Sequence, residues 1–331
     1  MIKTFKLILI NILIFILLFF LSEYIVYFFC IKTNPVGDNP PQKFHYLLRN
    51  PDIYIDDISN FFNGKSNNSF GRLPVGQEYN TTPITLFGCS YAFGQGLEPN
   101  QTFGYKLSEL LKRPVYNRAV PGQSFQEMYY QSSNKNFYRQ VPPCDTVIYI
   151  MMTDNIRRLY TNIFDMNVLG NYFMLHYDIK DGQLIYQDYS NPIMNFIKSL
   201  YIVKLLHLKF TYLYVTNPKN QQKIADDTVL YFTETRKNLE NKWKKKIKFY
   251  ILFYQDKFLY SDLLKEKLEY NGFRVVELYK LTKENINSDK YKIQNDVHPN
   301  EAAWDLITPL FIEFMQKDEN SEKYSETLNK N

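Results

Sequence analysis

Short apolar runs alternate with helix-like segments from Pro83 to Gln316. Strands that alternate with helices are typical of a parallel β-sheet with helices on both faces. We therefore predict an α/β domain over residues 82–316. The predicted strands are 84–87, 115–118, 146–152, 247–254 and 274–278, and the predicted helices are 102–112, 124–136, 261–271 and 301–316, with Ser124 as an N-cap.

The alternation lapses over residues 156–245, which we interpret as an insertion after the third strand. It contains two strand-like pieces joined across residues 180–182, an apolar helix near 193–208 and a charged helix near 226–246. We expect it to cover the carboxyl edge of the sheet, where α/β folds bind ligands. Its aromatic residues fit either sugar stacking or a core, and they are Tyr160, Phe164, Tyr172, Phe173, Tyr177, Tyr186 and Tyr189.

The N-terminal residues 1–31 are predicted to form a single transmembrane anchor, since about 20 apolar residues suffice to cross a bilayer. Lys3 and Lys6 precede the apolar run, which favours a cytoplasmic N-terminus and an extracytoplasmic domain at a bacterial inner membrane. The bulky residues before Cys30 argue against a cleaved signal peptide. Residues 32–81 resemble a stalk, and residues 317–331 a polar, disordered tail.

Composition excludes several classes of function. The net charge of +5 comes from dispersed basic residues, so nucleic acid is not a predicted partner. The three cysteines give neither a disulfide framework nor zinc spacing. No metal-ligand cluster and no phosphate-binding glycine loop occurs in the sequence, and we predict no cofactor and no metal.

A serine turn follows the first predicted strand. The sequence breaks at Gly88, and Ser90 comes just before the next helix. A serine between a strand and a helix suits a nucleophile, because the backbone N–H groups there can stabilise an oxyanion. Cys89 is an alternative nucleophile, but a small buried side chain is the favoured interpretation.

His298 opens the last predicted helix, two residues after Asp296. Either Asp296 or Asn295 can hold its Nδ1–H, which leaves Nε2 to accept the serine proton. Because the ends of parallel strands share one edge of a sheet, we expect Ser90 and His298 to meet there.

These residues resemble the four conserved blocks of SGNH/GDSL-type hydrolases. Gly88-Cys89-Ser90, Gly122, Asp154-Asn155 and Asp296-Val297-His298-Pro299 occur in that family's order and at its spacing. The segment Asn68-Ser-Phe-Gly-Arg72 also looks like one found before the serine strand in this superfamily. The resemblance covers residues 68–159 and 246–316, and it implies a three-layer α/β/α, flavodoxin-like fold.

The resemblance implies a role for each residue. Ser90 is the expected nucleophile, His298 the general base, and Asp296 the residue that orients it. The expected oxyanion hole combines the backbone amides of Ser90 and Gly122 with the Asn155 side chain.

There are three departures from the family pattern. The first is Cys89 in place of its Asp, and the second is the third block, where Met152 replaces its Gly and Asp154 its Asn. The third is Asn295-x-x-His298 in place of its Asp-x-x-His, with Asp296 one position closer to the histidine. A carboxylate at position 154 would repel an oxyanion, and this is why Asn155 is the predicted donor. Arg157 and Arg158, which follow this block, suit either an anionic substrate or a solvated surface.

The predicted activity is hydrolysis of an O-acyl ester, an O-acetyl group of a cell-envelope glycan being the expected substrate. One alternative is an O-acyltransferase that uses the same site with a sugar hydroxyl in place of water. A second alternative is an inactive glycan-binding or assembly protein that keeps the fold. The expected partners are the acylated glycan, or another small ester, and the membrane.

Overall fold

The computed structural model describes residues 2–27, 72–160, 177–186, 200–255 and 261–328. Its centre is a five-stranded sheet in the order β2-β1-β3-β6-β7, with every pair of neighbours parallel. The strands are β1 (Ile84–Gly88), β2 (Val115–Asn117), β3 (Thr146–Met151), β6 (Lys248–Phe253) and β7 (Arg274–Glu277). This order is the flavodoxin-like one, so the predicted α/β fold is confirmed.

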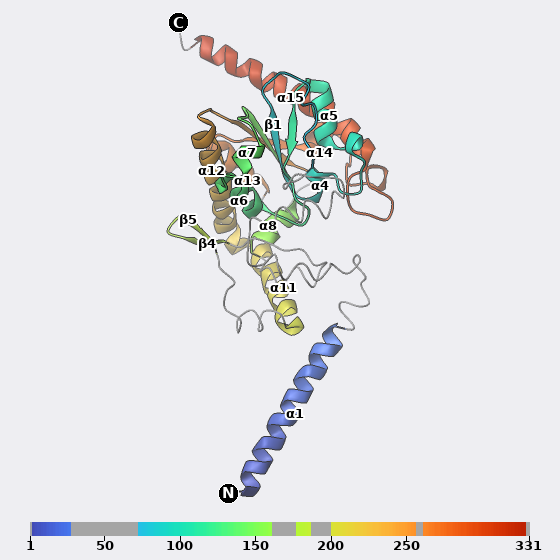
Figure 1. The fold of residues 1–331 in the computed structure, drawn as a ribbon, viewed down its shortest axis with the longest axis vertical. Helices are drawn as coiled ribbons and strands as arrows, with labels where there is room; N and C mark the ends of the chain where they lie inside the picture. Colours follow the sequence, from blue (N-terminus) through green and yellow to red (C-terminus); the bar gives the residue numbers. More distant parts are fainter. Residues whose placement is uncertain (1, 28–71, 161–176, 187–199, 256–260, 329–331) are drawn as a thin grey trace.

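Helices cover both faces of the sheet (Figure 1). One face packs against α5 (Phe103–Leu111), α14 (Leu278–Thr282) and α15 (Glu301–Leu328). The other packs against α6 (Phe125–Ser133), α7 (Phe137–Gln140), α12 (Gln221–Trp243) and α13 (Ser261–Tyr270). The other α-helices of the described residues are α1 (Ile2–Tyr27), α4 (Ser90–Phe93), α8 (Thr153–Leu159) and α11 (Tyr201–Thr216). Short 3-10 turns lie at Pro99–Gln101, Pro218–Asn220 and Asp289–Tyr291.

The central strand β3 shows why three layers form. All six of its residues are buried, because successive side chains alternate between two covered faces. Tyr149 packs in the core beneath α6 and α12, while Ile148 and Ile150 pack in the core beneath α5 and α15. The run of apolar residues that predicted this strand therefore reflects the burial of its side chains on both faces of the sheet.

Helix α12 corrects the predicted insertion. Ile224, Phe232 and Leu239 are wholly buried in the core beneath the sheet. The helix therefore forms the crossover between β3 and β6, rather than covering the carboxyl edge. The many charged residues of α12 made the segment look polar by composition, although one face of the helix is apolar and buried.

Part of the predicted insertion forms an antiparallel hairpin of β4 (Tyr177–Lys180) and β5 (Gln183–Tyr186). Asp181 and Gly182 both have positive φ, as a two-residue hairpin turn requires. Tyr177 is buried and contacts Tyr129 and Tyr231, so that its ring serves the core. Tyr186 packs on Tyr177, and the Tyr160 hydroxyl donates to Asp227. The other predicted stacking residues, Phe164, Tyr172, Phe173 and Tyr189, lie outside the described residues.

Both ends of the chain differ from the expectation. Residues 317–328 belong to α15 and are not a disordered tail, and Asp318 accepts hydrogen bonds from Tyr250 and Arg274. At the other end, the described part of the predicted stalk joins the domain, since Val75 pairs with Val115 beside β2. Within the stretches that the structure describes, no helix has both the length and the apolar character needed to cross a membrane.

Candidate active site

Ser90 begins α4 at the carboxyl end of β1 and is only 7% exposed. The turn before it requires glycine. Gly88 has a φ of 144°, and a Cβ there would lie 2.7 Å from the Ala92 Cβ and 2.9 Å from the Ile150 carbonyl oxygen. The strand can thus turn sharply into α4, as a nucleophile turn demands.

Arg72 holds the other end of α4. Its Nε donates to the Phe93 carbonyl at 2.6 Å, and its Nη2 donates to the carbonyls of Gly94 and Leu97 at 2.7 and 3.0 Å. The guanidinium also lies 4.7 Å from the centre of the Phe93 ring. Burial lowers the pKa of Arg72, and the charge of Glu98 partly opposes that shift. The segment that looked like a family feature therefore ends in a clamp on the serine helix.

His298 and Asp296 lie on the loop before α15. His298 Nδ1 is 2.6 Å from Asp296 Oδ1, which also accepts the backbone N–H groups of Val297 and His298. Burial alone would raise the pKa of Asp296, but its hydrogen bonds and the charge of His298 hold that pKa below its usual range. An ionised Asp296 keeps the proton on Nδ1, so that Nε2 is the atom free to act as a base.

The serine turn and the histidine loop meet at Tyr91. Its hydroxyl donates to the Val297 carbonyl at 2.8 Å, and its ring centre lies 5.4 Å from that of His298. No direct hydrogen bond between Ser90 and His298 occurs among the described residues. Catalytic hydrogen bonds are often long without substrate, so adjacency of the two elements is the informative feature.

Gly122 occupies the turn between β2 and α6 with a φ of 76°. This turn lies beside the serine turn, because the Val120 N–H donates to the Gly88 carbonyl at 3.1 Å. Ser124 does not cap α6 with its side chain as predicted, since its hydroxyl donates to the Asn155 carbonyl instead. The second and third sequence blocks are therefore bonded together next to the first.

Asn155 is wholly buried and joins two of the blocks. Its Oδ1 accepts the Met152 N–H at 2.8 Å, and its Nδ2 donates to the Gln123 carbonyl at 3.0 Å. One of its two N–H donors is therefore already bonded to the backbone. The oxyanion role of Asn155 stays a prediction, whereas its bonds show a role in holding the site together.

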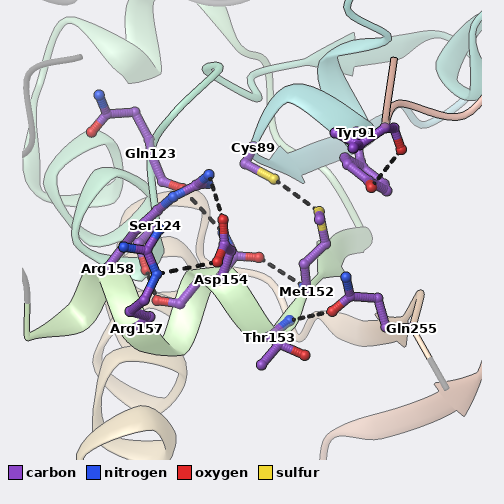
Figure 2. Close-up of polar contacts among 12 residues, drawn as sticks. Cys89, Tyr91, Gln123, Ser124, Met152, Thr153, Asp154, Arg157, Arg158 and Gln255 are labelled. Atoms are coloured by element: carbon purple, nitrogen blue, oxygen red, sulfur yellow. Dashed lines mark hydrogen bonds and ion pairs between the residues drawn. The ribbon is translucent and has the colours of Figure 1, made fainter. Parts of the chain in front are cut away.

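Asp154 lies among positive charges (Figure 2). Its carboxylate pairs with Arg157 and Arg158, each at 3.2 Å. Burial alone would raise the pKa of Asp154, but the two arginines hold it below its usual range. The repulsion expected between this carboxylate and an oxyanion is thus reduced by paired charge. Arg157 and Arg158, which suited either an anionic substrate or a solvated surface, are engaged with Asp154.

Two of the three departures from the family pattern contact each other. Cys89 is wholly buried, and its Sγ lies 3.6 Å from the Met152 Sδ (Figure 2). Cys89 therefore packs as a small core side chain. The described residues include no group of three His, Cys, Asp or Glu that could hold a metal ion.

Sequence reasoning missed two residues of this site. Tyr91 was not considered because the prediction for this turn concerned only Ser90. Its position directly after the nucleophile could have indicated a role in the site. Gln255 follows β6, and its Oε1 accepts the Thr153 N–H at 3.0 Å (Figure 2). A search for polar residues at strand ends would have found Gln255.

No protein-family model matches the sequence, and a search among curated proteins finds no match. Among solved structures, the chain is similar to a member of the lipolytic protein G-D-S-L family from Veillonella parvula DSM 2008. The identity is 12%, the TM-score is 0.40, and the match covers 70% of this chain and 97% of that one. The chain is also similar to the acetyl xylan esterase Est2A from the rumen bacterium Butyrivibrio proteoclasticus, at 11% identity and a TM-score of 0.42, over 77% of this chain and 68% of that one. Similarity this distant does not establish a shared activity, which has to come from the residues of the site.

Proposed function

We propose that the protein is a serine-dependent ester hydrolase of the SGNH/GDSL type. The observation that carries this proposal is the Asp296–His298 pair, 2.6 Å apart, on a loop bonded to the turn that holds Ser90. A nucleophile, a base and a residue that orients the base are the parts that acyl transfer to serine needs.

In this mechanism Ser90 Oγ attacks the acyl carbonyl while His298 Nε2 takes the serine proton. The backbone N–H groups of Ser90 and Gly122 bind the oxyanion. His298 then returns the proton to the leaving alcohol, and the acyl group stays on Ser90. Water attacks the acyl-enzyme while His298 Nε2 accepts a proton from it. The bond between the acyl carbon and Ser90 Oγ then breaks, His298 gives the proton to Ser90 Oγ, and the free acid leaves.

We further propose an O-acetyl ester of a cell-envelope glycan as substrate and a membrane-attached, extracytoplasmic enzyme. The location is supported by the lysines that precede the apolar N-terminal run of the sequence. The glycan substrate is proposed together with this location. A reporter that is active only outside the cytoplasm, fused after residue 40, should give signal. Absence of signal would place residue 40 in the cytoplasm and contradict this topology.

The chemistry is tested with a fluorophosphonate probe and with p-nitrophenyl acetate. The wild-type protein should label and turn over, and Ser90→Ala should lose both. Cys89→Ala is the matched control, since it alters the neighbouring buried side chain and should keep labelling. Equal labelling of wild type and Ser90→Ala would remove Ser90 from the mechanism.

Two other outcomes identify the alternatives. With an acetylated donor and a glycan acceptor present, acyl transfer that outpaces release of free acid would replace hydrolysis by an O-acyltransferase activity. A wild-type protein that neither labels nor turns over, yet binds the glycan, would be a binding or assembly protein.

A further inference from the structure

We propose that Tyr91 is a positioning residue whose hydroxyl holds the loop carrying His298 in register with Ser90. This inference rests on the proposed hydrolase function and assigns a part of the site that the family motifs do not name. Tyr91 follows the nucleophile directly, so a contact made by its side chain is tied to the position of Ser90.

The histidine loop is closed mostly on itself. The Ile293 N–H donates to the His298 carbonyl at 2.9 Å, and the Asp296 N–H donates to the Ile293 carbonyl at 2.9 Å. Asn295 turns the chain between them with a φ of 61°. These bonds fix the shape of the loop but not its place relative to the nucleophile.

The hydrogen bond from Tyr91 supplies that placement. In the described part of the chain, it is the one hydrogen bond that leaves residues 293–298 for another segment, and it ends on the Val297 carbonyl at 2.8 Å. Ile293 adds an apolar contact, since its Cδ1 lies 2.8 Å from where a Cβ on Gly96 would be. The loop is therefore docked on the serine turn by the Tyr91 hydrogen bond, by the contact between the Tyr91 and His298 rings, and by Ile293 against Gly96.

The Tyr91 ring is itself held from a third direction. It packs edge-on against Tyr254, which follows β6, with ring centres 5.0 Å apart. Tyr254 in turn packs against Trp304 of α15, at 5.6 Å. Burial raises the pKa of the Tyr91 hydroxyl, so it is a neutral donor at physiological pH. A rigid ring with an obligatory donor is suited to set a distance between two loops.

The consequence is a test that separates placement from stability. Tyr91→Phe keeps the ring and its packing and removes only the donor to Val297. Misplacement of a base by a fraction of an ångström to 1 Å costs about 10-fold to 100-fold, so we expect kcat for p-nitrophenyl acetate to fall by that factor with KM unchanged. We also expect amide exchange in residues 293–298 to become about 10-fold faster, since one hydrogen bond is lost.

Tyr254→Phe is the matched control. Its hydroxyl donates to the Ile286 carbonyl at 3.4 Å, away from the histidine loop, and the aromatic pair with Tyr91 is kept. We expect this variant to retain wild-type kcat and wild-type exchange in residues 293–298. Both variants should unfold within a few degrees of the wild-type protein.

The outcomes are distinguishable. Wild-type kcat and wild-type exchange in Tyr91→Phe would overturn the positioning role and leave hydrolysis by Ser90 standing. Equal losses in Tyr91→Phe and Tyr254→Phe would also overturn it, since a general loosening would then be the cause. If the wild-type protein neither labels nor turns over, the proposed function fails. In that case, amide exchange of residues 293–298 in Tyr91→Phe still tests whether Tyr91 holds the loop, and exchange at the wild-type rate would contradict it.

Discussion

The two halves of the candidate site are held in place by different forces. Ser90 is 7% exposed and lies on a turn where Ala92 is wholly buried. The histidine loop is open to solvent, with Val297 63% exposed, and hydrogen bonds within the loop give it its shape. Packing therefore holds the nucleophile in place, and hydrogen bonds within the loop give the base its local geometry.

Ser90 and His298 are both needed for the proposed reaction, but substitutions around them should affect the stability of the fold to different extents. Changes in the serine turn should reduce stability, because they disturb the core. Changes in the histidine loop should reduce activity while the fold stays intact.

Gly88→Ala should have the largest effect on stability. An alanine at a φ of 144° is strained, and its Cβ would lie 2.9 Å from the Ile150 carbonyl oxygen. We expect a loss of about 3 to 5 kcal/mol in the free energy of unfolding, measured with urea. Gly182→Ala is the control, since its Cβ meets nothing within 4 Å. It should cost about 1 kcal/mol for the positive φ alone. Equal losses in both would show that the serine turn is not held by packing.

Asp296→Asn should lower kcat by about 100-fold or more, because the imidazole loses its negative partner and its preferred tautomer. The urea midpoint should hardly change, since the loop is exposed. Asn295→Gly is the matched control, because glycine accepts the positive φ and leaves the Asp296–His298 contact in place. A larger loss of kcat in Asn295→Gly would assign the orienting role to Asn295.

Arg72→Gln should lower both stability, by about 2 kcal/mol, and kcat, by about 10-fold, because three carbonyls at the end of α4 lose a charged donor. Arg236 offers a matched control. It donates to the carbonyls of Asn271 and Gly272 and lies 4.2 Å from the centre of the Phe273 ring, away from the site. Arg236→Gln should lose stability and keep kcat. A wild-type kcat in Arg72→Gln would show that the Arg72 hydrogen bonds contribute to stability but not to catalysis.

Glu277 should give the smallest effect, a stabilisation that is present at neutral pH and lost in acid. Burial alone would raise its pKa, but hydrogen bonds from Lys280, Tyr279 and Lys265 lower the pKa to about 2. Because the folded-state pKa lies below the unfolded value, its stabilisation is complete above about pH 4.5 and is lost as the pH falls toward 2. With exposed partners we expect about 1 kcal/mol. Urea titrations at pH 7 and pH 3 should show a smaller acid loss in Glu277→Gln, and a wild-type acid loss there would contradict this account.

Much of the fold could be predicted because its strands are buried on both faces. Runs such as Thr146–Met151 are apolar throughout, and their ends are marked by polar or turn residues. The role of α12 was missed because its buried apolar residues recur at helical spacing among charged ones, and the overall composition of the segment does not show that spacing. The helical tail was missed because Asp318 is stabilised by Arg274 and Tyr250, which lie far from it in the sequence.

The same reasoning explains what was found in the site. Ser90, Gly122 and His298 follow from turn chemistry and from the family blocks, which are local in sequence. The choice between Asn295 and Asp296 depended on side-chain geometry, which places Asp296 against the imidazole. The hydrogen bonds that the Asn155 and Tyr91 side chains donate end on backbone carbonyls of other segments, and the sequence does not show which carbonyl accepts such a bond.

The clamp on α4 also decides where a useful fragment of this protein must begin. The expected boundary at residue 82 would retain every strand of the sheet but remove Arg72 and the Val75 pairing beside β2. Such a truncated chain would still fold around its core, yet the helix that starts with Ser90 would lose the support of its last carbonyls. Shortened versions intended for crystallisation or assay should therefore start well before Arg72. Otherwise the domain will fold, but Ser90 will react slowly with the ester.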